Sequence, residues 1–289
     1  MSVDFHNSYE FSYIDHIKYK WYRYMRKYDE LKHKIRLNFD KNYAFCRACD
    51  SGQIDEVKSL VQRGADIHSE DNFAMWVVSS NGYLNILEFL IEKGADIHAE
   101  NDKALQLASQ SGCFEIVKYL VEKGADIHVN SNYALRSASH NGQLKIVKFL
   151  IEKGADIHAK NDFALRFASQ NGRFEIVKYL VENGADIHAE DDYTLRVSSQ
   201  HEYLDIVKFL IEKGADIHAE NDYALRVATQ KGHIDVVNLL IENGADIKST
   251  SNDDFYINPQ LETVEWFCEM GNYHSEVGLN RLKSVLWIR

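Results

Sequence analysis

Proline is almost missing from this 289-residue chain, which contains a single one, Pro259. Long proline-rich linkers are therefore excluded. The four cysteines lack the spacing of a disulfide framework, which favours a reducing compartment. No apolar run approaches the roughly 18 residues that span a bilayer, and the N-terminus lacks the basic-then-apolar pattern of a secretion signal. These absences predict a soluble protein of the cytoplasm.

Basic charge is in deficit as well, with 44 Asp and Glu against 33 Lys and Arg and a net charge of −11. Because phosphate contacts need a basic face, nucleic acid is disfavoured as a partner of the whole chain. The sequence has no phosphate-cradling glycine loop, His-Glu-x-x-His helix or nucleophile elbow. Its carboxylates return at regular intervals, whereas catalysis normally needs one unique constellation. We therefore expect no enzyme, no cofactor, no metal and no small-molecule substrate.

What the sequence does have is a repeat of 30 residues. The segment Gly94-Ala95-Asp96-Ile97-His98 returns from Gly124, Gly154, Gly184 and Gly214, with an earlier copy from Gly64 and a late one from Gly244. A fixed period between about 20 and 50 residues is typical of stacked repeat arrays. Seven copies without an insertion predict one continuous solenoid.

The first half of each unit predicts a short helix. In the unit that begins at Asp102, this residue stands where an N-cap carboxylate would accept from the free amides of the first turn. Leu105 and Ala108 then face inward, and Gly112 ends the helix in a left-handed conformation. Glu202 stands where other units have this glycine, so the sixth turn should be strained or differently shaped.

A second helix follows over residues 114–121. Ile116, Val117, Leu120 and Val121 form an apolar stripe of helical width, and Gly124 ends the helix. One such pair is too small to bury its own stripe, so stacking on the neighbouring pairs must supply the core.

The pattern Ala-Leu-x-x-Ala, followed by Leu/Phe-x-Ile-Val-x-x-Leu-Ile/Val-x-x-Gly-Ala-Asp-Ile, resembles the ankyrin repeat over residues 42–250. The resemblance implies an all-α solenoid of helical hairpins. Ankyrin units usually have about 33 residues, and Tyr133-Ala134-Leu135-Arg136 replaces their Thr-Pro-Leu-His start. We therefore expect shortened fingers in place of β-hairpins. Short, proline-poor units of this kind are similar to the ankyrin proteins of giant amoebal DNA viruses, the mimivirus type.

Three regions follow from this reading: an N-terminal helical cap over residues 1–41, seven helix pairs over 42–250, and a degenerate eighth repeat with a C-terminal cap over 251–289. Solenoid ends need caps because their last apolar face has no neighbour. Two alternatives stay open. The basic and aromatic residues between 9 and 36 could bind RNA or anionic lipid, and residues 251–289 could recruit a ubiquitin ligase.

Two side-chain patterns could indicate a metal site or reactive cysteines, and each also has a structural explanation. Histidines recur at 68, 98, 128, 158, 188 and 218. Packed helices lie about 8–10 Å apart, whereas zinc ligands lie about 2 Å from the ion, so neighbouring histidines cannot share one. The resemblance implies that this position fixes the finger backbone and is sometimes hydroxylated by an asparaginyl hydroxylase. Cys46 and Cys49 fall inside the first helix of the first unit, where small packing residues are expected.

The remaining candidate for function is a surface. Ankyrin proteins commonly bind partners through the fingers and first helices, which line a concave groove, and the resemblance thus implies a protein-binding scaffold. Its candidate contacts are Phe73, Trp76, Ser80, Lys103, Gln106, Gln110, Tyr133, Arg136, His140, Lys160, Phe163, Arg166, Tyr193, Arg196, Tyr223 and Arg226.

Trp76 and Lys103 differ from the residues at the equivalent positions of the other repeats, and they are the best candidates for specificity. The arginines have an alternative role, because Arg166 follows Asp162 at i,i+4 and could simply pair with it. The resemblance to viral ankyrin proteins implies that the chain acts on host proteins in the host cytoplasm or nucleus. The partner of the chain is expected to be another protein.

Overall fold

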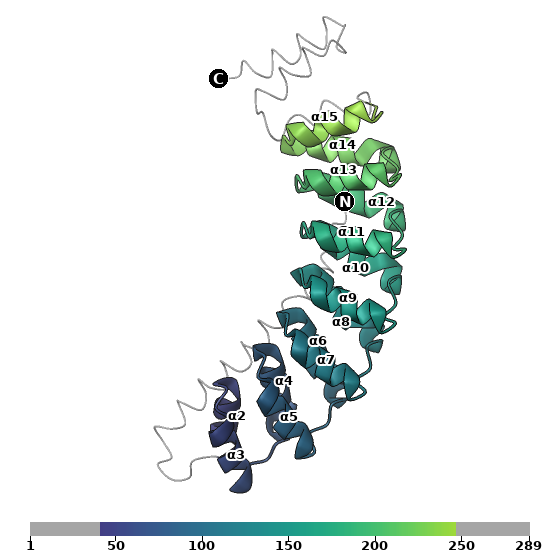
Figure 1. Cartoon of the computed structure of the whole chain (residues 1–289). Coiled ribbons are helices and arrows are strands. Elements are labelled where there is room, and N and C mark those ends of the chain that lie inside the picture. Colours follow the sequence, from purple (N-terminus) through teal and green to yellow (C-terminus); the bar gives the residue numbers. More distant parts are fainter. Residues whose placement is uncertain (1–40, 247–289) are drawn as a thin grey trace, which may run out of the picture. The chain divides into compact units, whose positions relative to one another are not determined.

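The computed structural model describes residues 41–246 and consists of helices throughout that range (Figure 1). Fourteen helices form seven hairpins there, without a strand, which confirms the predicted all-α repeat fold. The chain divides into two compact units between Val129 and Asn130, and each unit is described by itself. The predicted caps, the basic-aromatic segment and the eighth repeat lie outside the described residues.

The first unit contains three hairpins. Their helices are α2 (Lys41–Asp50), α3 (Ile54–Gln62), α4 (Ser69–Asn81), α5 (Leu84–Glu92), α6 (Ala99–Ser111) and α7 (Phe114–Glu122). The first helices pack in the order α2, α4, α6, and the second helices in the order α3, α5, α7. Each hairpin therefore adds one helix to each of two layers.

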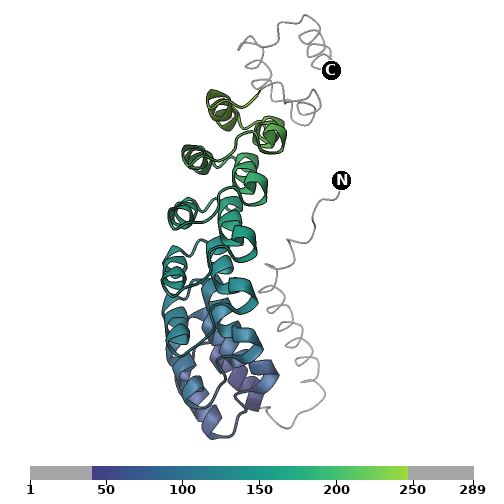
Figure 2. The same cartoon turned by 90° about the vertical axis from the view of Figure 1, so that its right-hand side faces the viewer.

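The second unit contains four hairpins, and only Val129, the first residue of α8, lies before its boundary. Its helices are α8 (Val129–Asn141), α9 (Leu144–Glu152), α10 (Ala159–Gln170), α11 (Phe174–Glu182), α12 (Ala189–Gln200), α13 (Leu204–Glu212), α14 (Ala219–Lys231) and α15 (Ile234–Glu242). Here α10, α12 and α14 pack in one row and α9, α11, α13 and α15 in another, so the two-layer arrangement recurs (Figure 2).

The core of each unit is made by the stripes that the period predicts. In α6, Leu105 and Ala108 are buried, and in α7 Ile116 and Leu120 are buried. Val121 is half-buried, so the stripe of α7 is narrower than expected. Because each stripe is covered by the neighbouring hairpins, burial of apolar surface holds the stack together.

Glycine ends each second helix for a backbone reason. Gly94 has φ of 97°, its N–H donates to the Ile91 carbonyl at 3.0 Å, and the Ala95 N–H donates to the Leu90 carbonyl at 2.9 Å. This pair of bonds is a Schellman motif, which requires a left-handed residue at its centre. A Cβ on Gly94 would meet no atom within 4 Å. The left-handed conformation alone therefore selects glycine here.

A different turn joins the first helix of each hairpin to the second, and Glu202 stands in this turn where most hairpins have glycine. Its φ is 62°, close to the 65° of Gly172. The turn before α13 therefore keeps the shape of the others, and the strain predicted at this residue is present. A non-glycine residue in this conformation costs roughly 1 kcal/mol.

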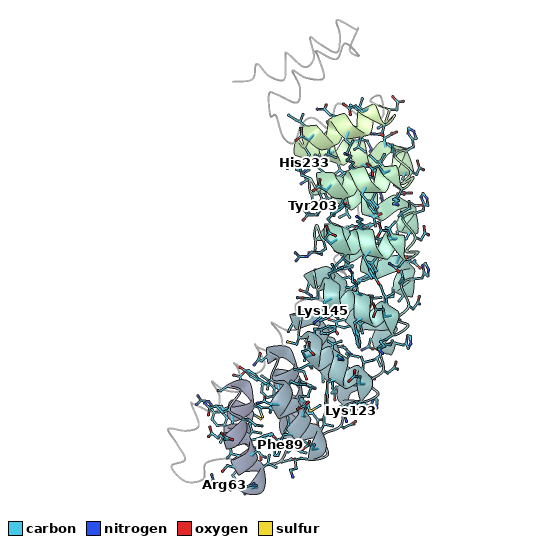
Figure 3. All side chains as sticks on the ribbon, in the orientation of Figure 1. Arg63, Phe89, Lys123, Lys145, Tyr203 and His233 are labelled. Atoms are coloured by element: carbon cyan, nitrogen blue, oxygen red, sulfur yellow. The ribbon has the colours of Figure 1, made fainter. Side chains whose placement is uncertain are left out.

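Replacing Glu202 with glycine should raise the free energy of unfolding by about 1 kcal/mol, because the left-handed strain disappears. The substitution also removes a contact between Glu202 Oε2 and His233 Nδ1, which lie 3.3 Å apart (His233 is labelled in Figure 3). Exposed pairs contribute only about 0.5 kcal/mol. Urea denaturation measures the difference. Glu202→Ala is the control, since it loses the pair but keeps the strain; a glycine variant no more stable than the alanine variant contradicts the account.

Candidate functional site

The fingers that join the hairpins are built on three consecutive left-handed residues. Glu100, Asn101 and Asp102 have φ values of 52°, 56° and 53°. The same conformation recurs in the second unit at 130–132, 160–162, 190–192 and 220–222. Asn and Asp tolerate it better than most residues, which explains why they recur here. The finger turns back without strands, and this confirms the predicted shortening.

The last left-handed residue of each finger ties it to the next finger. Asp102 is buried, and its Oδ1 accepts from the backbone N–H of Asp126, at 3.1 Å, and from His98 Nδ1, at 3.0 Å. The prediction that Asp102 caps the first-turn amides is therefore wrong. An N-cap residue normally has a β-region backbone, whereas Asp102 is left-handed.

The same tie recurs in the second unit. Asp162, Asp192 and Asp222 accept from the backbone N–H 24 residues further on at 2.9, 2.8 and 3.0 Å, and Asn132 does so at 3.0 Å. Each bond joins the start of a hairpin to the segment that follows its second helix, so this column of hydrogen bonds fixes the position of each finger relative to the next within the unit.

The histidine of the repeat holds the finger in shape. The His98 backbone N–H donates to Asp96 Oδ1 at 2.9 Å, and its ring Nδ1 lies against Asp102. Because a carboxylate can only accept, Nδ1 carries the proton and Nε2 is left toward solvent. The ring thus contacts the finger backbone only indirectly, through the Asp102 carboxylate that accepts from the Asp126 N–H. Within residues 41–246, no cluster of three or more His, Cys, Asp or Glu side chains could hold a metal ion.

Cys46 and Cys49 are packing residues, as expected. Both are buried in α2. Burial is the main cause that raises the pKa of the Cys49 thiol, and the neighbouring Cys46 and Asp50 add to it. A redox cysteine needs a lowered pKa to form its thiolate. The Cys49 thiol therefore lacks the activation that disulfide chemistry requires.

In the first unit, the candidate contacts lie on α4 and α6 and are less accessible than expected. Phe73, Lys103, Gln106 and Gln110 are buried, and Trp76 is half-buried with its Nε1 covered. Burial lowers the pKa of Lys103 to about 8, and the nearby Glu100 opposes this shift. The sequence pattern could not reveal this burial, because it shows only which face of the helix a residue occupies.

In the second unit, the candidate contacts form a row that we call the arginine–aromatic column. Its members are Tyr133, Arg136, Phe163, Arg166, Tyr193, Arg196, Tyr223 and Arg226. Each of the first three guanidinium groups lies between the ring of its own hairpin and the ring of the next. For Arg166 the two distances to ring centroids are 5.3 Å, to Phe163, and 5.4 Å, to Tyr193; for Arg196 they are 5.9 Å, to Tyr193, and 5.4 Å, to Tyr223.

The arginines bond the finger backbone and do not pair with the aspartate at i−4. Nη2 of Arg166, Arg196 and Arg226 donates to the carbonyl six residues earlier, at 3.2, 2.8 and 3.2 Å. The predicted alternative of Asp162 pairing with Arg166 is therefore wrong. Asp162 is left-handed, so it does not share a regular helical face with Arg166. In the first unit Gln106 stands in for arginine, and its Nε2 donates to the Asn101 carbonyl at 2.6 Å.

Donor capacity remains on three of the four arginines. Arg136 is only 2% exposed and also uses its Nε, which donates to the Ser131 carbonyl at 3.0 Å. Arg166, Arg196 and Arg226 are half-buried and each make one hydrogen bond to the described chain. A guanidinium group carries five N–H donors. The Nε of each of these three arginines is buried, so the donors that remain for a further acceptor lie on the Nη atoms.

His140 lies near the end of the first helix of its hairpin. Burial lowers its pKa, and Arg173 lowers it further. Asn171 Nδ2 lies 2.8 Å from His140 Nδ1, so this ring nitrogen accepts. The ring also contacts Phe167, with centroids 5.6 Å apart. His140 is therefore committed to packing between two hairpins, and it is a weaker contact candidate than the arginines.

A family model described as ankyrin repeats (3 copies) matches residues 45–131, 128–191 and 190–251. The chain belongs to the ankyrin-repeat family. Ankyrin repeats are typically not catalytic, and no enzyme family matches. A search of curated proteins finds no match to the chain. Among residues 41–246, no helix has both the length and the apolar character to cross a membrane.

Within this ankyrin array, sequence reasoning missed the alternation of rings and arginines. The signal was present, because an aromatic residue and an arginine three positions later return every 30 residues from Tyr133 onward. At that spacing the two share a helical face. The contact between the ring and the arginine of one hairpin could have been inferred from this spacing, whereas the contact with the ring of the next hairpin could not.

Proposed function

We propose that this ankyrin-repeat protein is a scaffold without a reaction of its own, and that it binds a partner protein through the fingers and first helices that carry the sixteen candidate contacts. The observation that carries the proposal is the row of half-buried arginines with remaining donors between aromatic rings in the second unit. Arg and Tyr are enriched among the residues that dominate binding energy at protein interfaces. Membership of the ankyrin family supports a protein as the partner.

The proposals on viral origin, on the caps and on other functions each rest on a single argument. The short, proline-poor unit is the only support for a viral protein that acts on host proteins in the cytoplasm or nucleus. Flanking caps around residues 42–250 follow from the need to cover the ends of a stack. A ubiquitin-ligase adaptor role, like binding of RNA or lipid, would rest on segments outside the described residues, so we favour the scaffold.

An affinity capture experiment tests the proposed surface. Arg196→Glu/Arg226→Glu reverses two charges in the arginine–aromatic column, and Lys178→Glu/Lys208→Glu makes the same charge change on exposed positions of the second-helix layer. We expect the first variant to capture at least about tenfold less partner, because charge reversal at a contact replaces attraction with repulsion. The second variant should capture as much as the unmodified chain. Loss confined to the second variant would place binding on the opposite layer.

A further inference from the structure

We propose that the arginine–aromatic column of the second unit binds a polyproline II segment of the partner protein that carries an acidic residue at every third position. This inference rests on the proposed function and gives the chemistry of the partner. It starts from Arg166, Arg196 and Arg226, which present equivalent donors once per hairpin.

The guanidinium groups suit carboxylates. Each of these arginines spends one Nη2 donor on a finger carbonyl, in bonds that lie at the surface. The planar fork of a guanidinium group matches the two oxygens of a carboxylate, in a charge-assisted pair stronger than a neutral hydrogen bond. Aromatic rings on either side hold Arg166 and Arg196 in place. Little side-chain freedom is therefore left to lose on binding.

The spacing of the column selects the conformation of the ligand. Neighbouring first helices present one arginine each, and packed helices lie about 8–10 Å apart. A polyproline II helix has three residues per turn and a rise of about 3.1 Å, so every third side chain points the same way at intervals of about 9 Å. A β-strand repeats its face at about 6.7 Å. Of these two extended conformations, the polyproline II segment places one carboxylate opposite each arginine without stretching.

The rings of the column fit the residues between the acidic positions. Tyr223 is 36% exposed and Tyr193 is half-buried, so both offer part of a ring surface. Proline-rich polyproline II segments dock on aromatic-lined grooves, and their conformation is largely set before binding. Prolines between the acidic residues would pack on these rings and hold the carboxylates in register.

Charge on the fingers argues against nucleic acid. Asp191 and Glu220 are exposed on the fingers, and they share an acidic hollow with Asp216. A nucleic acid strand carries a phosphate at every nucleotide and would also face these carboxylates. A segment charged on one face only can turn its carboxylates toward the arginines.

The test measures fluorescence anisotropy of labelled peptides titrated with the full chain. The probe has four Glu-Pro-Pro repeats; one control peptide replaces Glu with Gln, and another has the same composition with its four Glu residues contiguous. The matched protein variant is Arg166→Gln/Arg196→Gln/Arg226→Gln, because Gln106 shows that glutamine can still bond the finger backbone at this position.

We expect the unmodified chain to bind the Glu-Pro-Pro probe at least about tenfold more tightly than either control peptide. The triple variant should lose about tenfold or more, since it loses charge-assisted bonds. Equal binding of the contiguous-Glu peptide would overturn the proposal in favour of unspecific charge attraction. Tighter binding of a helical peptide with Glu at every seventh position, or of a single-stranded oligonucleotide, would also overturn it. If no probe binds while the capture experiment still separates the two charge-reversal variants, the polyproline II ligand is wrong and the scaffold function stands.

Discussion

Leu210→Ala should lower the free energy of unfolding of the chain by about 3 kcal/mol. Leu210 lies on α13 and is 0% exposed, and α13 packs against both α11 and α15. The substitution removes buried methyl groups and leaves a cavity among three hairpins, and both effects add to the cost. Urea denaturation followed by circular dichroism gives the total loss.

The same helix supplies the control for this prediction. Leu204 is 37% exposed, so Leu204→Ala should cost no more than about 0.5 kcal/mol. Repeat arrays can lose cooperativity when one hairpin is weakened. Hydrogen exchange of the α13 amides should therefore be measured beside the urea curve. Similar losses for Leu204 and Leu210 would show that stacking does not bury this helix as described.

Asp192→Ala should lower the free energy of unfolding by about 2–3 kcal/mol, although the residue lies in a finger outside the apolar core. The Asp192 carboxylate is buried and accepts from the Asp216 N–H at 2.8 Å and from His188 Nδ1 at 3.2 Å. Its removal leaves a donor of the next finger without an acceptor, and a lost charge-assisted bond costs about 1.5–3 kcal/mol. Alanine also tolerates the left-handed backbone of this residue less well than aspartate.

Asparagine provides a control that the chain itself contains. Asn132 accepts from the Asp156 N–H at 3.0 Å, in the same position of its own finger. Asp192→Asn should therefore keep the tie and lose less than about 1 kcal/mol. The Asp216 amide should exchange faster in the alanine variant and at nearly the original rate in the asparagine variant. Exchange at the original rate in the alanine variant would mean that the Asp192 carboxylate does not hold the next finger.

The helices and their cores could be predicted from the sequence because they depend on local periodicity. Leu105 and Leu120 are spaced within their helices as buried residues must be, and glycine at 94 and 124 fixes the end of each hairpin. The 30-residue period then repeats one local solution along the chain. Stacking of neighbours follows, because no hairpin can cover its own stripe.

The side-chain partners at the candidate site could not be predicted in this way. The i,i+4 rule pairs Asp162 with Arg166 only if both lie on a regular right-handed helix. Asp162 is left-handed, so its carboxylate bonds the Asp186 N–H of the next finger, and Arg166 donates to a carbonyl of its own finger. Both outcomes depend on backbone geometry between repeats, which the period alone does not specify.

Site-specific photocrosslinking tests most directly whether the first-helix layer of the second unit is the binding surface. Benzoylphenylalanine would replace Tyr193 or Tyr223 in the arginine–aromatic column, and Phe149 or Tyr179 in the second-helix layer as controls; Tyr193, Phe149 and Tyr179 are half-buried, and Tyr223 is exposed. After irradiation in extracts of the cells that produce the chain, adducts with a discrete partner protein should form from positions 193 and 223. Adducts that form only from positions 149 and 179, or equally from all four, would contradict the account.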